Sequence, residues 1–409
     1  MDSNEIKAAI NALSPEQRRE LLAWLKERNR PLWLAWLSRL RAKSKPARIP
    51  PGLRRAVAGT LVGLIAFAVV EAAIFRSGWY GKYLEPVSMA GQMEYHLFWL
   101  RRMPPQKVPD VLVLGDSRIA EGFSVRIASA AVAGRVHFVN LAMLGSTPRV
   151  WYYTLRNIGK DLNRFSAIVI PFVRYSDLDA GEDLPNRVSD LNFLAAHLHW
   201  SDCRDFARSF TDTEVRRDAL AECLFRGVAL RPDIYEFLSD IPHRLKRAKD
   251  WRNNGLAYSE GYTGRPEDLK GLTMDEVSGT IQFPPGAKQS QIDTARATLT
   301  PPVVPQTGAV TAYRRRWIGA ILELLKTSPA RVIFIQIPNA PLPLADSTVP
   351  AQFIDSVKVN PRLTVLPVDT FRDVQRPELF FDGMHLNSTG RRLFSVELAK
   401  AVVPILETK

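Results

Sequence analysis

Cysteine is scarce in this chain of 409 residues, and its scarcity excludes several kinds of site. There are two cysteines, Cys203 and Cys223, and neither forms part of a Cys-x-x-Cys pair. Neither a zinc site nor a thioredoxin-like redox site is therefore indicated. The two residues would pair as a disulfide if this part of the chain is exported, and would otherwise be two buried thiols.

Acidic residues are also few relative to basic ones, with 42 Asp and Glu against 55 Lys and Arg. Residues 1–55 hold 13 Lys/Arg and 5 Asp/Glu, a net charge of +8, which leaves +5 for the other 354 residues. The basic excess therefore belongs mainly to the N-terminal tail. The chain lacks the interleaved basic and aromatic residues that single-stranded nucleic acids require, so nucleic acid is not an expected partner.

One long apolar run stands out from this background. Ala56 to Phe75 is twenty residues with a single charge, Glu71, and as a helix it would cover roughly 30 Å, the thickness of a bilayer core. We expect a membrane-spanning helix over 53–75; the competing interpretation is a buried core helix. Basic residues are concentrated before the run, which predicts a single-pass protein of the cytoplasmic membrane. Its N-terminus would be cytoplasmic and everything after residue 76 periplasmic or extracellular.

The cytoplasmic tail, residues 1–52, is expected to be amphipathic and helical. Ser14, Pro15 and Gln17 form a helix start signal, and residues 31–42 are rich in Trp and Leu with flanking Arg. Such a segment either lies in the lipid headgroup layer or folds as a small helical hairpin on itself or on a partner.

Beyond a juxtamembrane connector, 76–107, short apolar runs alternate with helical stretches through a domain at 108–409. The expected strands are 110–114, 135–141, 166–172, 331–337 and 362–368. The expected helices are 122–132, 148–160, 311–327 and 387–404. This alternation predicts an α/β fold, a parallel sheet covered by helices on both faces. The stretch 176–310 interrupts it and is expected to be an insertion, helical around 203–229 and 232–248.

Two short stretches carry the side chains that activate a hydroxyl nucleophile. Ser117 follows the first expected strand, where ligands bind in open parallel sheets. His385 is a candidate base for it, and Asp382, three residues earlier, would orient the imidazole. The N–H of Ser117 would be one donor to an oxyanion. Alternatively, Ser117 only caps the following helix and His385 is a surface histidine.

Three groups of residues resemble a known family. Gly115-Asp116-Ser117, Gly145 and Asp382-Gly383-Met384-His385 are together similar to the SGNH, or GDSL, hydrolase superfamily over roughly residues 108–405. The resemblance implies a flavodoxin-like three-layer αβα fold with a five-stranded parallel sheet. It also implies Ser117 as nucleophile, His385 as base, Asp382 as its partner, and the N–H groups of Ser117 and Gly145 in an oxyanion hole. No metal or organic cofactor is implied.

One block departs from the family pattern. The Gly-x-Asn-Asp expected after the third strand is missing; Arg174 or Tyr175 stands in for its Asn, or the oxyanion hole has two donors. The departure fits a membrane-anchored branch that resembles the D-alanine transfer protein and the alginate O-acetyltransferase accessory proteins. Those proteins imply a partner, a polytopic membrane-bound O-acyltransferase, and an envelope glycan or acyl-ester substrate.

The remaining cleft candidates follow from position alone. Asp116 either lines the cleft or supports the turn, and Asn140 and Asn339 end strands, where turn formation is an equal alternative. His137, His197, His199 and His243 lack a carboxylate at useful spacing and are expected to be structural.

Two functions from different classes follow. The first is a membrane-anchored esterase or O-acyltransferase that acts through an acyl-Ser117 intermediate. The second is a catalytically inactive SGNH-like scaffold or polymer-binding subunit of an envelope-modification complex. A weaker third is a thioesterase or lipase.

Overall fold

The computed structural model describes residues 17, 50–172, 184–254, 271–275, 280–290, 292–293, 296, 308–338, 362–367, 369–381 and 384–407. The chain divides into two compact units, Met1–Ala68 and Val69–Lys409. Nearly all of the expected amphipathic tail, 1–52, lies outside the described residues.

A long apolar helix leads out of the first unit. Helix α4, Pro51–Glu71, continues through one π-helical turn, η1, Ala72–Arg76. Among the described residues, Arg55–Arg76 is the one helix long and apolar enough to cross a membrane, and its 22 residues would extend over roughly 33 Å. The apolar side chains from Val57 to Val70 are exposed rather than packed in a core. The chain therefore has a candidate membrane span where the sequence predicts one.

The second unit is built on a five-stranded, all-parallel sheet with the order β2-β1-β3-β6-β7. Its strands are β1 Asp110–Val113, β2 His137–Asn140, β3 Phe165–Phe172, β6 Arg331–Gln336 and β7 Leu363–Val365. Each lies within one of the five expected strands or within a residue of it. The predicted α/β class and parallel sheet are confirmed.

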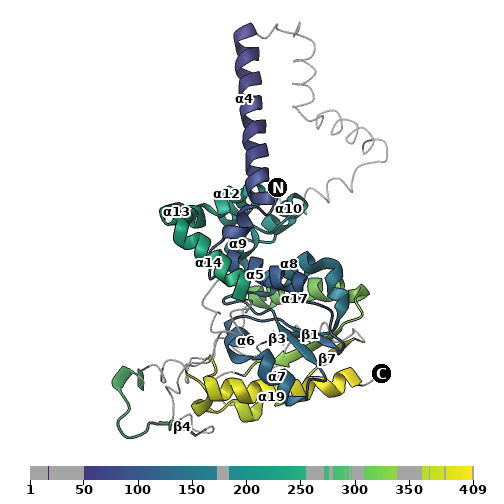
Figure 1. Cartoon of the computed structure of the whole chain (residues 1–409), viewed down its shortest axis with the longest axis vertical. Helices are drawn as coiled ribbons and strands as arrows, with labels where there is room; N and C mark the ends of the chain where they lie inside the picture. The colour runs from purple at the N-terminus through teal and green to yellow at the C-terminus, as the bar shows by residue number, and fades with distance from the viewer. Residues whose placement is uncertain are drawn as a thin grey trace. The chain divides into compact units, whose positions relative to one another are not determined.

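Both faces of the sheet are buried, which explains the continuous apolar runs of its strands. On β1, Leu112 belongs to the core on one face and Val111 and Val113 to the core on the other. Figure 1 shows helices on both faces. The face that carries Leu112 is covered by α5 Met89–Arg102, α8 Pro148–Ile158 and α17 Gly308–Leu324. The face that carries Val111 and Val113 is covered by α6 Ser117–Gly122, α7 Val125–Ala131 and α19 Ser388–Glu407.

The insertion between β3 and β6 contributes a group of short helices and a small antiparallel hairpin. The helices are α9 Ser189–Leu194, α10 Trp200–Arg208, α11 Thr213–Leu224, α12 Arg226–Ala229, α13 Arg231–Ser239 and α14 Ile241–Asn254. The hairpin is formed by β4 Thr273–Met274 and β5 Ile281–Gln282. Short 3₁₀ turns complete the unit: η2 Tyr80–Tyr83, η3 Gly159–Arg164, η5 Leu184–Asn186, η6 Leu325–Thr327, η7 Arg372–Val374 and η8 Pro377–Leu379.

The stretch expected to be helical around 203–229 consists of three helices, α10, α11 and α12, because the chain breaks twice within it. Asp212 caps a new helix by accepting from the N–H groups of Glu214 and Val215, and Phe225 is extended. Cys203 and Cys223 form a disulfide that joins α10 to α11. The alternative of two separate buried thiols is therefore wrong.

Candidate active site

The turn after β1 is shaped by Gly115. A Cβ at this position would stand 2.5 Å from the Cβ of Ile119, closer than real Cβ atoms come. A glycine is therefore needed for the first turn of α6 to fold back tightly against the end of the strand.

Asp116, not Ser117, caps α6. The Asp116 carboxylate accepts a hydrogen bond from the Arg118 N–H, and Ser117 is the first helical residue. The alternative that Ser117 is present only as the helix cap is therefore wrong, since the cap position belongs to its neighbour. The Ser117 hydroxyl remains available for another partner.

His385 lies in a tight loop just before α19. Phe380 and Leu386 form an antiparallel bridge across this loop, and the Phe381 N–H donates to the His385 carbonyl oxygen at 3.1 Å. The Phe381 ring stacks on the imidazole, with 5.5 Å between ring centres. These contacts fix both the backbone and the ring plane of His385.

Asn387 connects this loop to α19. Its Oδ1 accepts from the N–H groups of Thr389 and Gly390 at 3.1 and 3.0 Å, which caps the helix. Its Nδ2 donates to the Glu378 carbonyl oxygen at 2.8 Å, and the side chain is completely buried. Asn387 therefore ties the segment before His385, at Glu378, to the start of α19 after it, and so restrains the position of His385.

The two stretches meet at the hydroxyl and the imidazole. Ser117 Oγ and His385 Nε2 are 2.9 Å apart, a hydrogen-bonding distance between residues 268 positions apart in sequence. Both side chains are half-buried. With Nε2 unprotonated, the imidazole accepts the serine proton, which is the arrangement that activates a serine nucleophile.

A carboxylate and a guanidinium flank this pair. Arg118 and Asp116 form an ion pair with 2.5 Å between Nη2 and Oδ2. Burial alone would raise the pKa of Asp116, but the Arg118 charge and hydrogen bonds outweigh it, helped by the charge of His385. The pKa of Asp116 therefore lies below its ordinary value of 3.8, and the residue is ionised at neutral pH.

A small cavity of about 50 Å³ lies next to the pair, at the carboxyl ends of the strands. Neither Ser117 nor His385 lines it, but their neighbours Asp116 and Arg118 do. The other lining residues come from the loop after β2, from α8, from β3, from the insertion, from α17 and from the end of β6: Ser146, Thr147, Pro148, Trp151, Pro171, Phe172, Leu184, Arg187, Arg314, Ile318 and Ile337. The lining therefore combines apolar side chains with three guanidinium groups, those of Arg118, Arg187 and Arg314.

Arg187 and Arg314 are site residues that the sequence did not indicate. They come from segments more than 120 residues apart, and no motif includes either. Burial and then the nearby charge of Arg118 lower the pKa of Arg314 to about 10, although Asp116 opposes this. Arg314 therefore still carries its charge at neutral pH.

Gly145 lies in the loop that follows β2, with a positive φ of 76°. This loop is held against the β1–α6 turn, because the Met143 N–H and the Ser146 hydroxyl both donate to the Gly115 carbonyl oxygen. A Cβ on Gly145 would stand 4.0 Å from a terminal nitrogen of Arg187. The loop therefore places Gly145 next to the turn that carries Ser117, with a guanidinium nearby.

Asn140 is buried, and its side chain bonds to the backbone of α6 and of the loop after β2. Its Nδ2 donates to the carbonyl oxygens of Ile119 and Phe123, and its Oδ1 accepts from the Ala142 N–H. It supports α6 and does not line the cavity. The other expected site residues, Asp382, Arg174, Tyr175 and Asn339, lie outside the described residues.

His137 has a carboxylate partner, contrary to expectation. Its Nδ1 is 2.7 Å from Asp110 Oδ1, and the same carboxylate accepts from Arg164. The partner was missed because it is 27 residues away, and only the parallel register of β1 and β2 sets the two side by side. The pair lies at the amino ends of the strands, away from Ser117.

No protein-family model matches the chain, and no curated protein matches its sequence.

Proposed function

We propose that this protein is a membrane-anchored serine esterase or O-acyltransferase of the SGNH type, acting on hydroxyls of a cell-envelope glycan or glycolipid. The observation that carries the proposal is the 2.9 Å contact between Ser117 Oγ and His385 Nε2. The strand order, which matches the flavodoxin-like order of that superfamily, supports it. The site lies at the carboxyl ends of the strands, where such folds bind ligands.

The reaction would run in two steps. Ser117 Oγ attacks the ester carbonyl carbon while His385 Nε2 takes the hydroxyl proton, and the tetrahedral intermediate collapses as His385 returns that proton to the leaving alcohol. An acyl-Ser117 ester remains. In the second step His385 deprotonates a sugar hydroxyl, or water, which attacks the ester carbonyl, and His385 then returns that proton to Ser117 Oγ as the ester bond breaks. Asp382 would stabilise the protonated imidazole.

Oxyanion stabilisation would come from the N–H groups of Ser117 and Gly145. Arg174 or Tyr175 would replace the missing Asn of the third block, or the hole would have two donors. Arg187 is a second candidate, because its guanidinium lies beside Gly145 and lines the cavity next to the turn.

The candidate span would hold the unit at the outer surface of the cytoplasmic membrane, with the N-terminus in the cytoplasm. A polytopic membrane-bound O-acyltransferase would supply the acyl group across the membrane. The disulfide between Cys203 and Cys223 supports an exported location, because disulfides persist in oxidising compartments.

Replacement of Ser117 by Ala tests the proposal. The hydroxyl has no capping role, so Ser117→Ala should fold normally. It should lower hydrolysis of a chromogenic acetyl ester on the order of a thousandfold or more, and abolish fluorophosphonate labelling. Ser129→Ala, on α7, is the matched control and should label like the unchanged protein. Unchanged envelope acylation in cells carrying Ser117→Ala would instead favour the inactive scaffold.

A further inference from the structure

The outer end of the candidate span is bound to the insertion. Glu71, the one charge within the apolar run, is 5% exposed, and its Oε1 accepts from the backbone N–H of Arg226 at 2.6 Å and of Gly227 at 3.4 Å. Phe75 packs directly on Gly227, where a Cβ would come within 2.9 Å of the ring. The N-terminal turn of α12 is therefore in direct contact with the end of the span.

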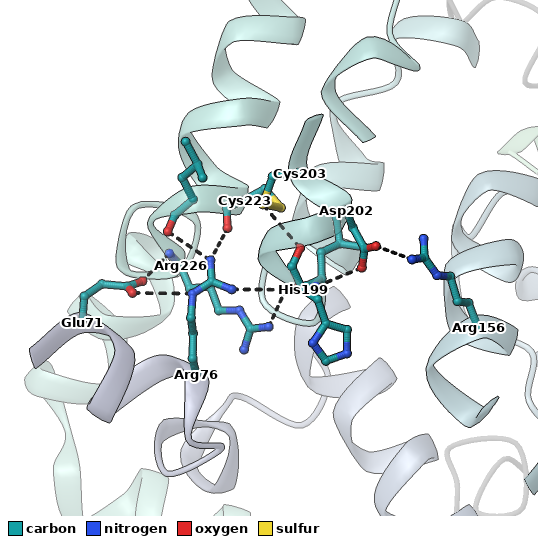
Figure 2. The surroundings of a disulfide bond; sticks show 10 residues. Glu71, Arg76, Arg156, His199, Asp202, Cys203, Cys223 and Arg226 are labelled. Carbon is teal, nitrogen blue, oxygen red and sulfur yellow. Dashed lines mark hydrogen bonds and ion pairs between the residues drawn. A yellow bond between two sulfur atoms is a disulfide. The ribbon is translucent and has the colours of Figure 1, made fainter. Parts of the chain in front are cut away.

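Arg76 attaches the disulfide-linked helices to the same point. Its guanidinium donates to the carbonyl oxygens of Leu198, Cys223 and Leu224, and lies 4.6 Å from the centre of the Trp200 ring. Figure 2 shows Glu71 and Arg76 facing Arg226 and the disulfide. Since the disulfide joins α10 to α11, both helices are held at the residue where the span ends.

The connector attaches α13 and α14 in the same way. The Tyr80 hydroxyl donates to Asp233 at 2.8 Å, and Arg244 bridges Asp233 and Glu85. The rings of Tyr83 and Phe237 are in contact. Helices α10 to α14, which we call the juxtamembrane helices, are therefore fixed to residues 71–85 by buried polar and aromatic contacts.

These helices carry an unusual share of exposed apolar side chains. Among the described residues after Arg76, twelve large apolar side chains are exposed, and ten of them are Trp79 or lie between residues 200 and 245. Tyr235 and Leu238 are 69% and 61% exposed, and Val228 is 50% exposed. The others in this group are Trp200, Leu220, Leu224, Phe225, Ile241 and Leu245. Exposed large apolar side chains are thus concentrated in this part of the chain, and such a concentration indicates an interaction site.

The occupant that fits is lipid. Leu224, Phe225 and Val228 are next or nearly next in sequence to Arg226 and Gly227, which bind Glu71, so they lie near the outer end of the candidate span. Exposed Arg231 lies among the apolar positions and exposed Lys246 and Lys249 follow them on α14, and basic side chains suit the phosphates of a headgroup layer. Trp and Tyr are likewise enriched at that depth.

We propose that the exposed apolar side chains of the juxtamembrane helices insert into the outer leaflet of the membrane that Arg55–Arg76 crosses. The unit would then have one preferred orientation relative to the bilayer instead of reorienting freely about its connection to the span. This inference depends on the proposed span and on no step of the Ser117 chemistry.

The test uses the full chain in vesicles of phosphatidylcholine and phosphatidylglycerol, with no other protein present. Val228→Cys and Leu238→Cys, on α12 and α13, are each labelled with an environment-sensitive fluorophore, since the native cysteines are joined in a disulfide. The control is Lys400→Cys on α19, where the side chain is 61% exposed. Lipids that carry a nitroxide near the headgroup then serve as quencher.

We expect nitroxide lipid to reduce the emission at both test positions by about twofold or more and to leave the control unchanged. Fluorophores at the two test positions that are quenched no more than the one at Lys400→Cys would overturn the inference. That result would favour a protein partner as the occupant of this surface. Fluorophosphonate labelling of Ser117 in the same vesicles is read separately. Retained labelling without quenching refutes the lipid contact alone, whereas quenching without labelling refutes the proposed catalytic function alone.

Discussion

Replacement of Asn387 by Ala should loosen the His385 loop while leaving Ser117 untouched. The completely buried amide caps α19 through Oδ1 and joins the loop to Glu378 and Phe380 through Nδ2. Loss of a helix cap costs about 1 kcal/mol, and each further buried hydrogen bond about 1 kcal/mol. We therefore expect Asn387→Ala to lower the free energy of unfolding by about 3 kcal/mol.

Thermal unfolding followed by calorimetry measures this loss. For a unit of the size of Val69–Lys409, 3 kcal/mol corresponds to a fall in Tm of roughly 4 °C. Well below the Tm, fluorophosphonate labelling of Ser117 should slow by about tenfold or more, because the imidazole is no longer held at hydrogen-bonding distance. Asn387→Asp keeps an acceptor for the cap and should recover part of the stability. An Ala variant that unfolds and labels like the unchanged protein would refute the reasoning about this loop.

Three other changes have expected outcomes. Asp190→Asn should destabilise the unit by about 3 to 5 kcal/mol in denaturant titrations, because it leaves the fully buried Arg149 without its charge partner; a loss below about 1 kcal/mol would contradict this. Because the folded pKa of Asp116 is lowered, its ionised form contributes stability above the ordinary carboxyl pKa of about 4, and that contribution is lost as the pH falls below it. Acid unfolding of Asp116→Asn should therefore show a shallower pH dependence below about pH 4, and an identical curve would count against the shift. Gly115→Ala should slow ester hydrolysis by about tenfold or more, because its Cβ would collide with Ile119 and move Ser117, whereas unchanged rates would show that the turn tolerates a side chain.

Much of the fold could be predicted from the sequence because the sheet is buried on both faces. Such strands must be continuously apolar, and runs such as Ala167 to Ile170 and Val332 to Ile335 satisfy this. The span was recognisable for a similar reason, since a bilayer imposes its own length on an apolar helix. Ser117 and His385 could be chosen because each stands at a strand end or a helix start in a short motif.

Contacts between distant segments could not be predicted in this way. Arg187 and Arg314 reach the cavity from separate elements, and His137 finds Asp110 only through strand register. The insertion has no single periodicity, because its helices are short and are held by a disulfide and by Arg76 rather than by one apolar stripe. In each case the residue can be read from the sequence, but the contact that gives it a role depends on how distant segments pack together.

Direct observation of an acyl group on Ser117 would test the central claim most directly. The full chain is mixed briefly with an activated acetyl ester, quenched in acid, digested and analysed by mass spectrometry. We predict one acetyl group on the peptide that contains Ser117, at a level that rises in His385→Gln only far more slowly than in the unchanged protein. Ester turnover with no modification of Ser117, or with the acetyl group on another residue, would contradict the account.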